Sequence, residues 1–433
     1  MTADRHRDST RRQQRPTLRR SLLATLLGAA LSLPALAAGL TLRIAEPLGP
    51  IPAGAITGFN VTAASTVVLN LDAWAAIDIE SLRFPPGNDA DDHELTPDRL
   101  RAFAQTWQLL GEPDVHLVTN FFAGPEHAVA AARTLQELGI TPRWWAIGNE
   151  PDLYPRNRMD PSWTAEVYCE RFREVRSALE AELGEVRTSG PAVSGSRPSG
   201  MDYLREIIGL CGDVIDLLTW HVYPTDGTAG DEHALATSRL LGDEIATVRS
   251  WLADPMVNPL GHERTVEIGV TEFGLSWRTA TFRHLEDMIA ALWLAETLGQ
   301  LASHGVDLGQ YFALQGLGGH GLIDRSGWVR PTYHVYAMLA GFGGHAHRVE
   351  GGDERLGAYA ADDGAAVRVL LVNRSLEAID VRLEGDALGT DLVVRTLDDV
   401  VFDEDAGPRT SRQPSTATVH VPARALVVIT SGR

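Results

Sequence analysis

The 433-residue sequence contains no lysine and only two cysteines, Cys169 and Cys211. Two cysteines cannot form the cysteine-rich spacings of zinc or iron–sulfur sites. Neither cysteine lies in a motif typical of a catalytic thiol. The pair is therefore either one structural disulfide or two buried thiols, and the sequence leaves both open.

Positive charge is also scarce. The 38 basic residues, all arginine, stand against 57 acidic residues, for a net charge of −19. Such an acidic protein has no electrostatic reason to bind nucleic acid or an anionic membrane surface. The same charge argues against a highly sulfated polysaccharide as substrate. We therefore expect neither nucleic acid nor a membrane among its partners.

The apolar run near the N-terminus, Ser21–Ala37, has 17 residues, fewer than the about 20 of a membrane-spanning helix. It follows seven arginines within residues 5–20 and ends in Ala35-Leu36-Ala37, a small-x-small cleavage pattern. We interpret residues 1–37 as a signal peptide for secretion or periplasmic export, with Arg19-Arg20 suggesting the twin-arginine route. An uncleaved anchor is the alternative.

A glycine-rich phosphate loop is missing after the first predicted strand, where the sequence reads Gly58-Phe59-Asn60-Val61. This absence disfavours an open, doubly wound nucleotide-binding sheet. Apolar β-branched runs instead alternate with amphipathic segments, which predicts an α/β protein with a (β/α)8 TIM barrel. The eight predicted strands are Ala55–Asn60, Ser81–Phe84, Val115–Phe122, Arg143–Gly148, Arg187–Val193, Val214–His221, Thr265–Thr271 and Leu308–Leu314.

Helices are predicted between these strands, although none is clear between the first two. Thr96-Pro97-Asp98 and Gly124-Pro125-Glu126 open two of them, since a cap residue or glycine precedes proline in the first turn. The others are Trp163–Leu183, Met201–Leu210, His233–Trp251, Phe282–His304 and Thr332–Gly341.

Short alternating runs replace the helices after about residue 345, which predicts a C-terminal antiparallel β-sandwich. The runs are Leu356–Ala360, Ala366–Asn373, Ile379–Leu383, Asp391–Thr396, Thr416–Pro422 and Ala425–Thr430. We expect Leu40–Leu48 to add an N-terminal strand to it. Aromatic residues after residue 350 are limited to Tyr359 and Phe402, so the sandwich is predicted to be structural rather than sugar-binding. The predicted domains are 1–37 (signal peptide), 38–54 (strand joining the sandwich), 55–344 (barrel) and 345–433 (sandwich).

Two predicted strands run directly into a glutamate. Trp144–Ile147 leads through Gly148-Asn149 to Glu150, and Val266–Thr271 leads to Glu272. Residues at the carboxyl ends of barrel strands point into the active-site mouth. Retaining glycoside hydrolysis needs two carboxyl groups about 5–5.5 Å apart, one protonated and one ionised.

Asn149-Glu150-Pro151 after the fourth strand and Thr271-Glu272-Phe273-Gly274 after the seventh resemble glycoside hydrolase clan A, over about residues 58–344. The resemblance implies that Glu150 is the general acid/base and Glu272 the nucleophile, and that Asn149 binds the sugar 2-hydroxyl. Residues Gly148–Tyr154 are most similar to family 79, the heparanase and β-glucuronidase group, with families 39, 44 and 51 close behind. The second-strand loop departs from these families, because it reads Pro-Pro-Gly-Asn in place of a doubled glycine.

The resemblance also implies three residues around the nucleophile. His221 and Tyr223 end the sixth strand in a His-x-Tyr pattern, and Arg83 ends the second strand. A hydrogen bond or guanidinium beside Glu272 would favour its ionised form. For each residue, an ordinary structural role is the alternative.

Further sugar contacts are expected from residues near strand ends. Tyr154, Trp277 and Trp328 could stack on sugar faces, and Gln315 and His320 follow the eighth strand. No metal or cofactor is predicted, because His221 is the one clear strand-end candidate for a metal ligand. The oxygen-rich segment 88–94 lacks the spacing of a calcium loop and is interpreted as solvated.

The sequence thus predicts an exported retaining glycoside hydrolase acting on β-linked or arabinofuranosidic glycosides of oligo- or polysaccharides. A transglycosylase with the same residues and a non-catalytic carbohydrate-binding barrel are the alternatives. The sequence does not determine the sugar.

Overall fold

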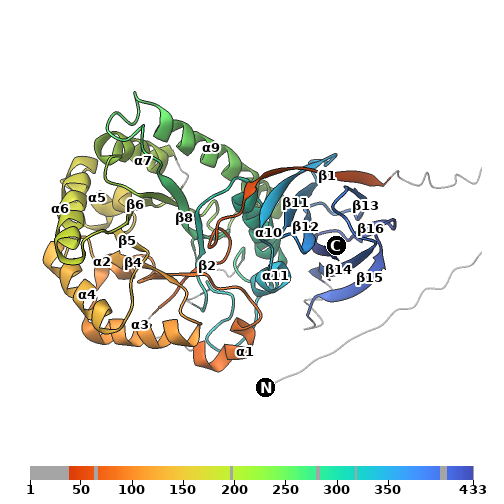
Figure 1. The fold of residues 1–433 in the computed structure, drawn as a ribbon, viewed down its shortest axis with the longest axis horizontal. Helices are drawn as coiled ribbons and strands as arrows, with labels where there is room; N and C mark the ends of the chain where they lie inside the picture. The colour runs from red at the N-terminus through yellow and green to blue at the C-terminus, as the bar shows by residue number, and fades with distance from the viewer. Residues whose placement is uncertain are drawn as a thin grey trace, which may run out of the picture. The chain divides into compact units, whose positions relative to one another are not determined.

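The structure is a computed structural model that describes residues 39–62, 67–195, 198–278, 283–316, 319–399 and 407–432 (Figure 1). The predicted signal peptide and Phe402 lie outside these residues, so export remains a prediction. Within them, no helix is both long and apolar enough to cross a membrane.

Eight parallel strands close into a barrel in sequence order (Figure 1). The barrel closes where Gly58 and Phe59 of the first strand pair with Gln310 and Tyr311 of the last. Every predicted strand is found, which confirms the predicted fold class. The strands are β2 (Gly58–Asn60), β3 (Ser81–Phe84), β4 (Asp114–Thr119), β5 (Trp144–Ile147), β6 (Thr188–Val193), β7 (Leu217–Val222), β8 (Glu267–Phe273) and β9 (Leu308–Tyr311).

Helices surround the barrel, and the two predicted helix starts are confirmed. The helix after Thr96 begins at Pro97, and the Thr96 hydroxyl accepts a hydrogen bond from the Arg99 N–H (3.3 Å). The next begins at Pro125 after Gly124. The main helices are α3 (Pro97–Leu109), α4 (Pro125–Glu137), α6 (Ala165–Leu183), α7 (Pro198–Cys211), α9 (Leu240–Ala253), α10 (Met288–Ser303) and α11 (Pro331–Leu339).

Short helical turns fill the remaining connections. Between β2 and β3, the described residues 61–62 and 67–80 contain two such turns and no longer helix. The predicted helix His233–Trp251 is divided into α8, η3 and α9. The short elements are η1 (Val67–Asn70), α1 (Leu71–Trp74), α2 (Asp89–Asp92), η2 (Pro151–Leu153), α5 (Tyr154–Asn157), α8 (Asp231–Ala236) and η3 (Thr237–Arg239).

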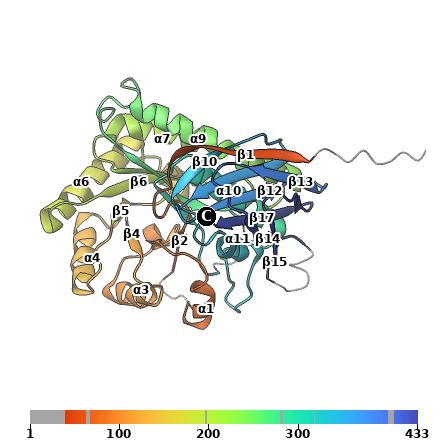
Figure 2. The same cartoon turned by 45° about the vertical axis from the view of Figure 1, so that its right-hand side comes forward.

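A nine-stranded sheet forms the C-terminal part, in the order β15-β14-β17-β12-β11-β10-β1-β13-β16 (Figure 2). Its strands are β1 (Leu40–Pro50), β10 (His345–Glu350), β11 (Leu356–Asp362), β12 (Ala366–Asn373), β13 (Ile379–Glu384), β14 (Asp391–Leu397), β15 (Arg409–Pro414), β16 (Val419–Val421) and β17 (Ala425–Gly432).

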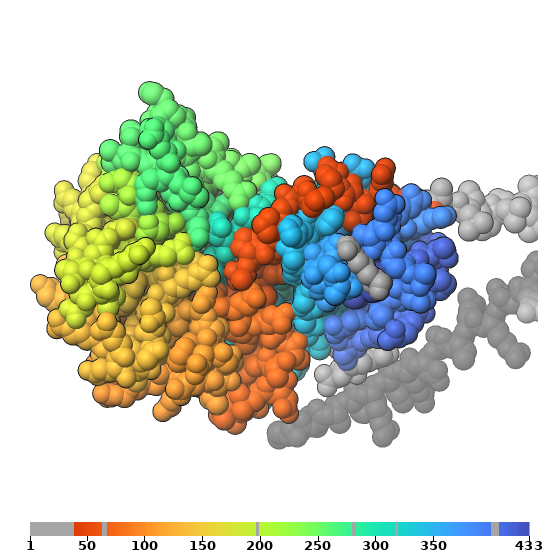
Figure 3. Space-filling model, in the orientation of Figure 1, coloured from red at the N-terminus to blue at the C-terminus, as the bar shows by residue number. Residues whose placement is uncertain are grey.

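The N-terminal strand β1 joins this sheet as predicted, and Figure 3 shows it lying against the C-terminal strands. It pairs antiparallel with β10 but parallel with β13. This parallel pair departs from the predicted all-antiparallel pattern, and it is possible because no hairpin connects these two strands. The prediction missed β10 and β15, whose polar sequences do not alternate with apolar residues.

Part of the sheet packs into the hydrophobic core of the barrel, and a second hydrophobic cluster lies within the sheet itself. Helix α10 is buried along almost its whole length and packs against β11 and β12. Within this contact, Glu296 of α10 accepts a hydrogen bond from the Tyr359 hydroxyl (2.8 Å) and pairs with Arg374 (2.7 Å). The sheet therefore covers one side of the barrel.

Cys169 and Cys211 form a disulfide between α6 and α7, with Cα atoms 5.8 Å apart. The structure thus selects the bridge over two buried thiols.

Candidate active site

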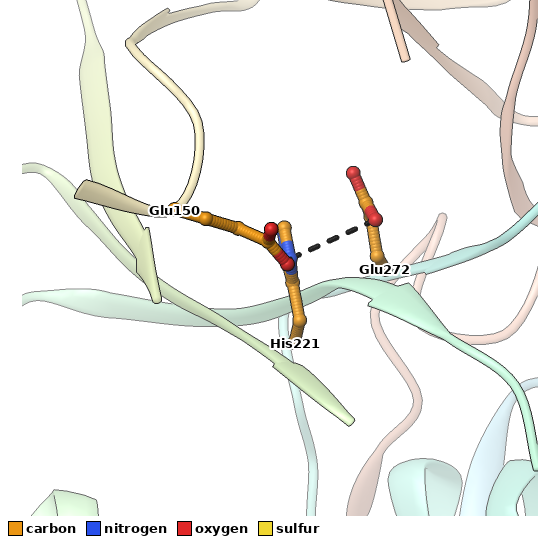
Figure 4. Close-up of side chains that lie close together, drawn as sticks. All are labelled: Glu150, His221 and Glu272. Atoms are coloured by element: carbon orange, nitrogen blue, oxygen red, sulfur yellow. Dashed lines mark hydrogen bonds and ion pairs between the residues drawn. The ribbon is translucent and has the colours of Figure 1, made fainter. Parts of the chain in front are cut away.

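Glu150 and Glu272 lie together at the carboxyl ends of β5 and β8 (Figure 4). Glu150 follows β5 in a left-handed turn (φ 51°), and its backbone N–H donates to the Ala192 carbonyl (3.0 Å). Its side chain is 16 % exposed, whereas that of Glu272 is 5 % exposed. The Glu150 carboxyl group is therefore accessible from the barrel mouth, whereas the Glu272 carboxyl group lies in its buried wall.

His221, at the end of β7, lies between the two glutamates. Its Nδ1 atom is 3.0 Å from Glu150 Oε1 and 3.7 Å from Glu272 Oε2. One oxygen from each glutamate and one His221 nitrogen all lie within 4.8 Å of one another. Two carboxyl oxygens within this limit fit the about 5–5.5 Å between the carboxyl groups of retaining glycosidases.

Three donors surround the Glu272 carboxyl group. Arg83 Nη1 (2.5 Å) and the Gly87 N–H (3.1 Å) donate to Oε1, and the Tyr223 hydroxyl donates to Oε2 (3.1 Å). A positive charge and hydrogen bonds to both oxygens favour the ionised carboxylate. An ionised carboxylate is the form that a nucleophile requires.

The surroundings of Glu150 favour its protonated form. Burial raises its pKa to about 7, and the negative charge of Asp152 adds to the effect, while Arg83 and Arg156 oppose it. Burial also lowers the pKa of His221 to about 4, so this imidazole is neutral near pH 7 and leaves Glu150 without a cationic partner there. A carboxylic acid with this pKa can donate a proton at neutral pH.

Arg83 is completely buried and connects the two halves of the site. Besides Glu272, its guanidinium donates to Asn60 Oδ1 (3.0 Å) and to Asn149 Oδ1 (2.6 Å). Asn60 in turn donates to the Thr271 carbonyl (2.9 Å), next to the nucleophile. The strand ends of β2, β3, β5 and β8 are thus joined by one planar cation.

One predicted sugar contact is corrected. Tyr154 is 3 % exposed, and its hydroxyl donates to Asp91 (2.5 Å). Its ring packs against Phe121 and Phe122. A sugar face cannot reach this ring, so Tyr154 is a structural support and not a stacking platform.

The other predicted sugar contacts have different surroundings. Trp277 and Trp328 are 43 % and 38 % exposed. His320 packs edge-on against Phe312 (5.1 Å between centroids), beside Tyr223. Gln315 is 9 % exposed, and in the described part of the chain neither of its side-chain polar atoms has a hydrogen-bond partner. Substrate contact by these residues remains a prediction.

The sequence analysis missed three contributors: Asn60, Gly87 and Asp91. Asn60 and Gly87 carry a recognisable signal, because each lies at or just after the end of a barrel strand. Asp91 does not, because it belongs to the acidic segment interpreted as solvated. That interpretation is wrong for Asp91, which is 6 % exposed and accepts hydrogen bonds from Phe121 N–H and Asn149 N–H (2.9 Å each).

Glu150, His221 and Glu272 are also close enough to be metal ligands. However, the Arg83 guanidinium contacts the same Glu272 carboxylate and would repel a cation there. The donor set therefore fits proton transfer and nucleophilic attack better than metal binding.

A parallel eight-stranded barrel with a strand-end glutamate pair and a C-terminal β-domain is the arrangement of clan A glycoside hydrolases. Comparison with known proteins confirms the resemblance to that clan. No family model matches the chain.

In sequence, the chain is similar to heparanases. It is 26 % identical to heparanase of Rattus norvegicus over 198 residues, which cover 45 % of this chain and 36 % of the rat protein. The match to heparanase of Bos taurus has the same identity and covers 35 % of that protein. The chain thus matches about a third of the length of these relatives.

In structure, the chain is similar to barrel proteins of two other families. An α-L-arabinofuranosidase of Thermotoga maritima has a TM-score of 0.72 at 17 % identity, covering 91 % of this chain and all of that one. A family 44 xyloglucanase of Paenibacillus polymyxa has a TM-score of 0.67 at 12 % identity, covering 91 % and 99 %. At this identity the likeness concerns the fold, and a fold does not determine the substrate.

Proposed function

We propose that this protein is a retaining glycoside hydrolase that cleaves β-linked or arabinofuranosidic glycosides by double displacement. The observation that carries the proposal is the pair Glu150 and Glu272. They lie together in the barrel mouth, one with a raised pKa and one held by Arg83. Opposite protonation states in two adjacent carboxyl groups are what the reaction needs.

In the first step, protonated Glu150 donates its proton to the departing glycosidic oxygen while Glu272 attacks the anomeric carbon. The bond to the leaving group breaks, and a covalent glycosyl–enzyme forms through a Glu272 oxygen. Attack removes negative charge from Glu272, so the hydrogen bonds that Arg83 and Tyr223 donate to this carboxyl group weaken as the covalent bond forms. Asn149, whose Oδ1 accepts a hydrogen bond from Arg83, binds the 2-hydroxyl of the sugar, next to the anomeric carbon.

In the second step, ionised Glu150 accepts a proton from water, which attacks the anomeric carbon from the face that the leaving group vacated. The bond to Glu272 breaks, and the sugar leaves with retained configuration. Glu150 ends protonated and Glu272 ionised, so the cycle can repeat.

The test is a screen of aryl β-glucuronide, xyloside, glucoside, galactoside and arabinofuranoside with the wild type and Glu272→Ala. We expect at least one substrate to be cleaved, and Glu272→Ala to lose about 10⁴-fold or more in kcat, because a nucleophile has been removed. Added azide should restore turnover of Glu272→Ala with inverted configuration. Full activity of Glu272→Ala without azide would show that the assignment is wrong.

The same screen distinguishes a hydrolase from a transglycosylase. With acceptor sugars added, a hydrolase releases free sugar as the main product, whereas a transglycosylase releases a lengthened glycoside. A protein that binds glycosides without cleaving any of them would support the non-catalytic alternative.

We also propose that the protein is exported and acts on oligo- or polysaccharides outside the cytoplasm. The Arg-rich, apolar N-terminal segment supports this, as does the disulfide, because disulfides persist mainly in oxidising compartments. N-terminal sequencing of the protein from the periplasm or medium of a bacterial host should find a mature chain starting at Ala38. Protein retained in the cytoplasm at full length would contradict the proposal.

A further inference from the structure

Asp91 is a buried carboxylate outside the reacting pair. It lies on α2, after the loop that follows β3, and accepts three hydrogen bonds. The Phe121 N–H donates to Oδ1 (2.9 Å), while the Asn149 N–H (2.9 Å) and the Tyr154 hydroxyl (2.5 Å) donate to Oδ2. All three partners are donors, so the group acts as an ionised acceptor.

The three donors come from the segments that follow two barrel strands, β4 and β5. Phe121 follows β4, and Asn149 and Tyr154 follow β5. Asp91 itself comes four residues after Gly87, whose N–H contacts Glu272. One side chain therefore ties the loops after three neighbouring strands to each other, directly behind the catalytic pair.

The contact with Asn149 falls at a strained point of the backbone. Gly148 (φ 78°) and Glu150 (φ 51°) on either side both have positive φ, and a non-glycine residue adopts this conformation at a cost of about 1–2 kcal/mol. The peptide N–H between them points at Asp91 and, more weakly, at the Tyr154 oxygen (3.2 Å). This contact acts together with two others that hold the turn leading to Glu150, the donation of the Glu150 N–H to the Ala192 carbonyl (3.0 Å) and of Arg83 to Asn149 Oδ1 (2.6 Å).

Burial raises the pKa of Asp91, and the hydrogen bonds from Tyr154, Phe121 and Asn149 oppose that effect, as does the charge of Arg158. A buried carboxylate with its donors removed is unstable, and so are the donors without it. Replacement of Asp91 should therefore disturb the turn, because the Phe121 N–H loses its acceptor and the Asn149 N–H keeps only the longer contact with the Tyr154 oxygen (3.2 Å).

We propose that Asp91 is a positioning residue for the acid/base, which acts by holding the Asn149–Glu150 turn so that the Glu150 carboxyl group faces the leaving oxygen. This inference rests on the proposed function. Asp91 does not touch the sugar, so its replacement should affect proton donation and leave nucleophilic attack largely intact.

The test compares Asp91→Asn with Asp92→Asn, which removes the same charge from the neighbouring position of the same helix. Asp92 is 47 % exposed and pairs only with Arg158 among the ion pairs of the described residues. Tyr154→Phe is a milder second variant, because it removes one donor and leaves both backbone contacts of Asp91. Thermal unfolding is measured for all variants.

The discriminating readout is kcat/KM with leaving groups of different acidity. A dinitrophenyl leaving group departs without protonation, whereas an alkyl or sugar leaving group needs the proton of Glu150. We expect Asp91→Asn to lose about 10²-fold with the poor leaving group, as for a misplaced catalytic group, and less than about threefold with the dinitrophenyl glycoside. Tyr154→Phe should show the same pattern to a lesser extent, and Asp92→Asn should match the wild type.

Hydrogen exchange of residues 147–153, followed by mass spectrometry, tests the same contact without any substrate. We expect faster exchange in Asp91→Asn and wild-type exchange in Asp92→Asn. An equal loss with all leaving groups, or unchanged exchange, would overturn the inference. If the wild type cleaves no glycoside, the proposed function fails, and the exchange result still decides whether Asp91 holds the turn.

Discussion

Glu150 and Glu272 are chemically identical side chains, and their surroundings give them different properties. Arg83, Gly87 and Tyr223 donate to Glu272. Among the described residues, Glu150 has a hydrogen bond with neutral His221 and none with a cation, and it lies near the negative charge of Asp152. The division of roles therefore depends on neighbours contributed by other strands.

The raised pKa of Glu150 predicts the pH dependence of the enzyme. The first step needs protonated Glu150, and its protonated fraction falls as the pH rises through about 7. We therefore expect kcat/KM for a substrate with a poor leaving group to decrease about tenfold per pH unit above that value. Measurement of the profile from pH 4 to 10 tests this.

Two variants control for other titrating groups. Glu150→Gln should lose the basic limb of the profile together with most of its activity on poor leaving groups. Asp152→Asn removes a negative charge that raises the pKa of Glu150, so its basic limb should move to lower pH. If the basic limb of the kcat/KM profile stays at the same pH in both variants, the titrating group is not Glu150.

Tyr223→Phe should reduce activity without unfolding the protein. The substitution keeps the ring that packs beside His320 and Phe312, and it removes the hydroxyl that donates to Glu272 (3.1 Å). The hydroxyl orients the attacking carboxylate, and because a misplaced catalytic group costs up to about 100-fold, we expect a loss of roughly 10–100-fold in kcat/KM. Steady-state kinetics and a melting temperature within a few degrees of the wild type would support this role, and unchanged kinetics would contradict it.

At the scale of elements, the site depends on the short turns that follow the barrel strands. The turn after β5 begins at Gly148, whose φ of 78° favours glycine. A Cβ atom added there would lie 2.5 Å from the Tyr154 oxygen and 3.1 Å from the Phe121 Cβ atom. The Tyr154 oxygen cannot move away easily, because its hydroxyl donates a hydrogen bond to Asp91.

Gly148→Ala should therefore destabilise the protein and reduce its activity. We expect a loss of about 2–4 kcal/mol in the free energy of unfolding, from overpacking added to backbone strain. Gly139→Ala is the matched control, since Gly139 has a similar φ of 73° with open space around the added atom. It should cost only about 1–2 kcal/mol and leave kcat/KM unchanged, and equal losses for both variants would contradict the packing argument.

At the scale of the whole molecule, the barrel and the sheet behave as one packed unit. Part of the sheet packs into the hydrophobic core of the barrel, and Glu296 of α10 is buried against Arg374 and Tyr359 of the sheet. Burial raises the pKa of Glu296, which Arg374 opposes. Removal of Arg374 would leave a buried carboxyl group without its cation.

Arg374→Met should lower the free energy of unfolding by about 3–5 kcal/mol, the usual cost of breaking a buried ion pair. All ten tryptophans precede residue 350, so their fluorescence reports on the barrel alone. We expect the barrel transition in urea to shift although the substitution lies in the sheet. Arg382→Met, which removes an exposed arginine of the same sheet, should change the free energy of unfolding by less than about 0.5 kcal/mol. A fluorescence transition unaffected by Arg374→Met would show that the barrel and the sheet unfold independently.

The barrel could be predicted from the sequence because each of its strands is a short apolar run between helical segments. The strand-end glutamates Glu150 and Glu272 could be predicted for the same reason, since parallel strands bring their carboxyl ends together, whereas Arg83 was predicted from the resemblance to the clan. Strands β10 and β15 could not be predicted, because their polar sequences lack the alternation of apolar and polar residues that marks a strand. Tyr154 was misassigned because its sequence position says nothing about what covers its ring.

The sequence by itself determined the barrel, the additional N-terminal strand of the sheet and the two glutamates at strand ends, because all three depend on local patterns and on strand geometry. Only the tertiary structure decided the disulfide, the burial of Asp91 and Tyr154, and the different surroundings of Glu150 and Glu272. These features depend on side chains from distant segments meeting at one point. Burial and neighbouring charge, which control protonation, exist only after the chain has folded.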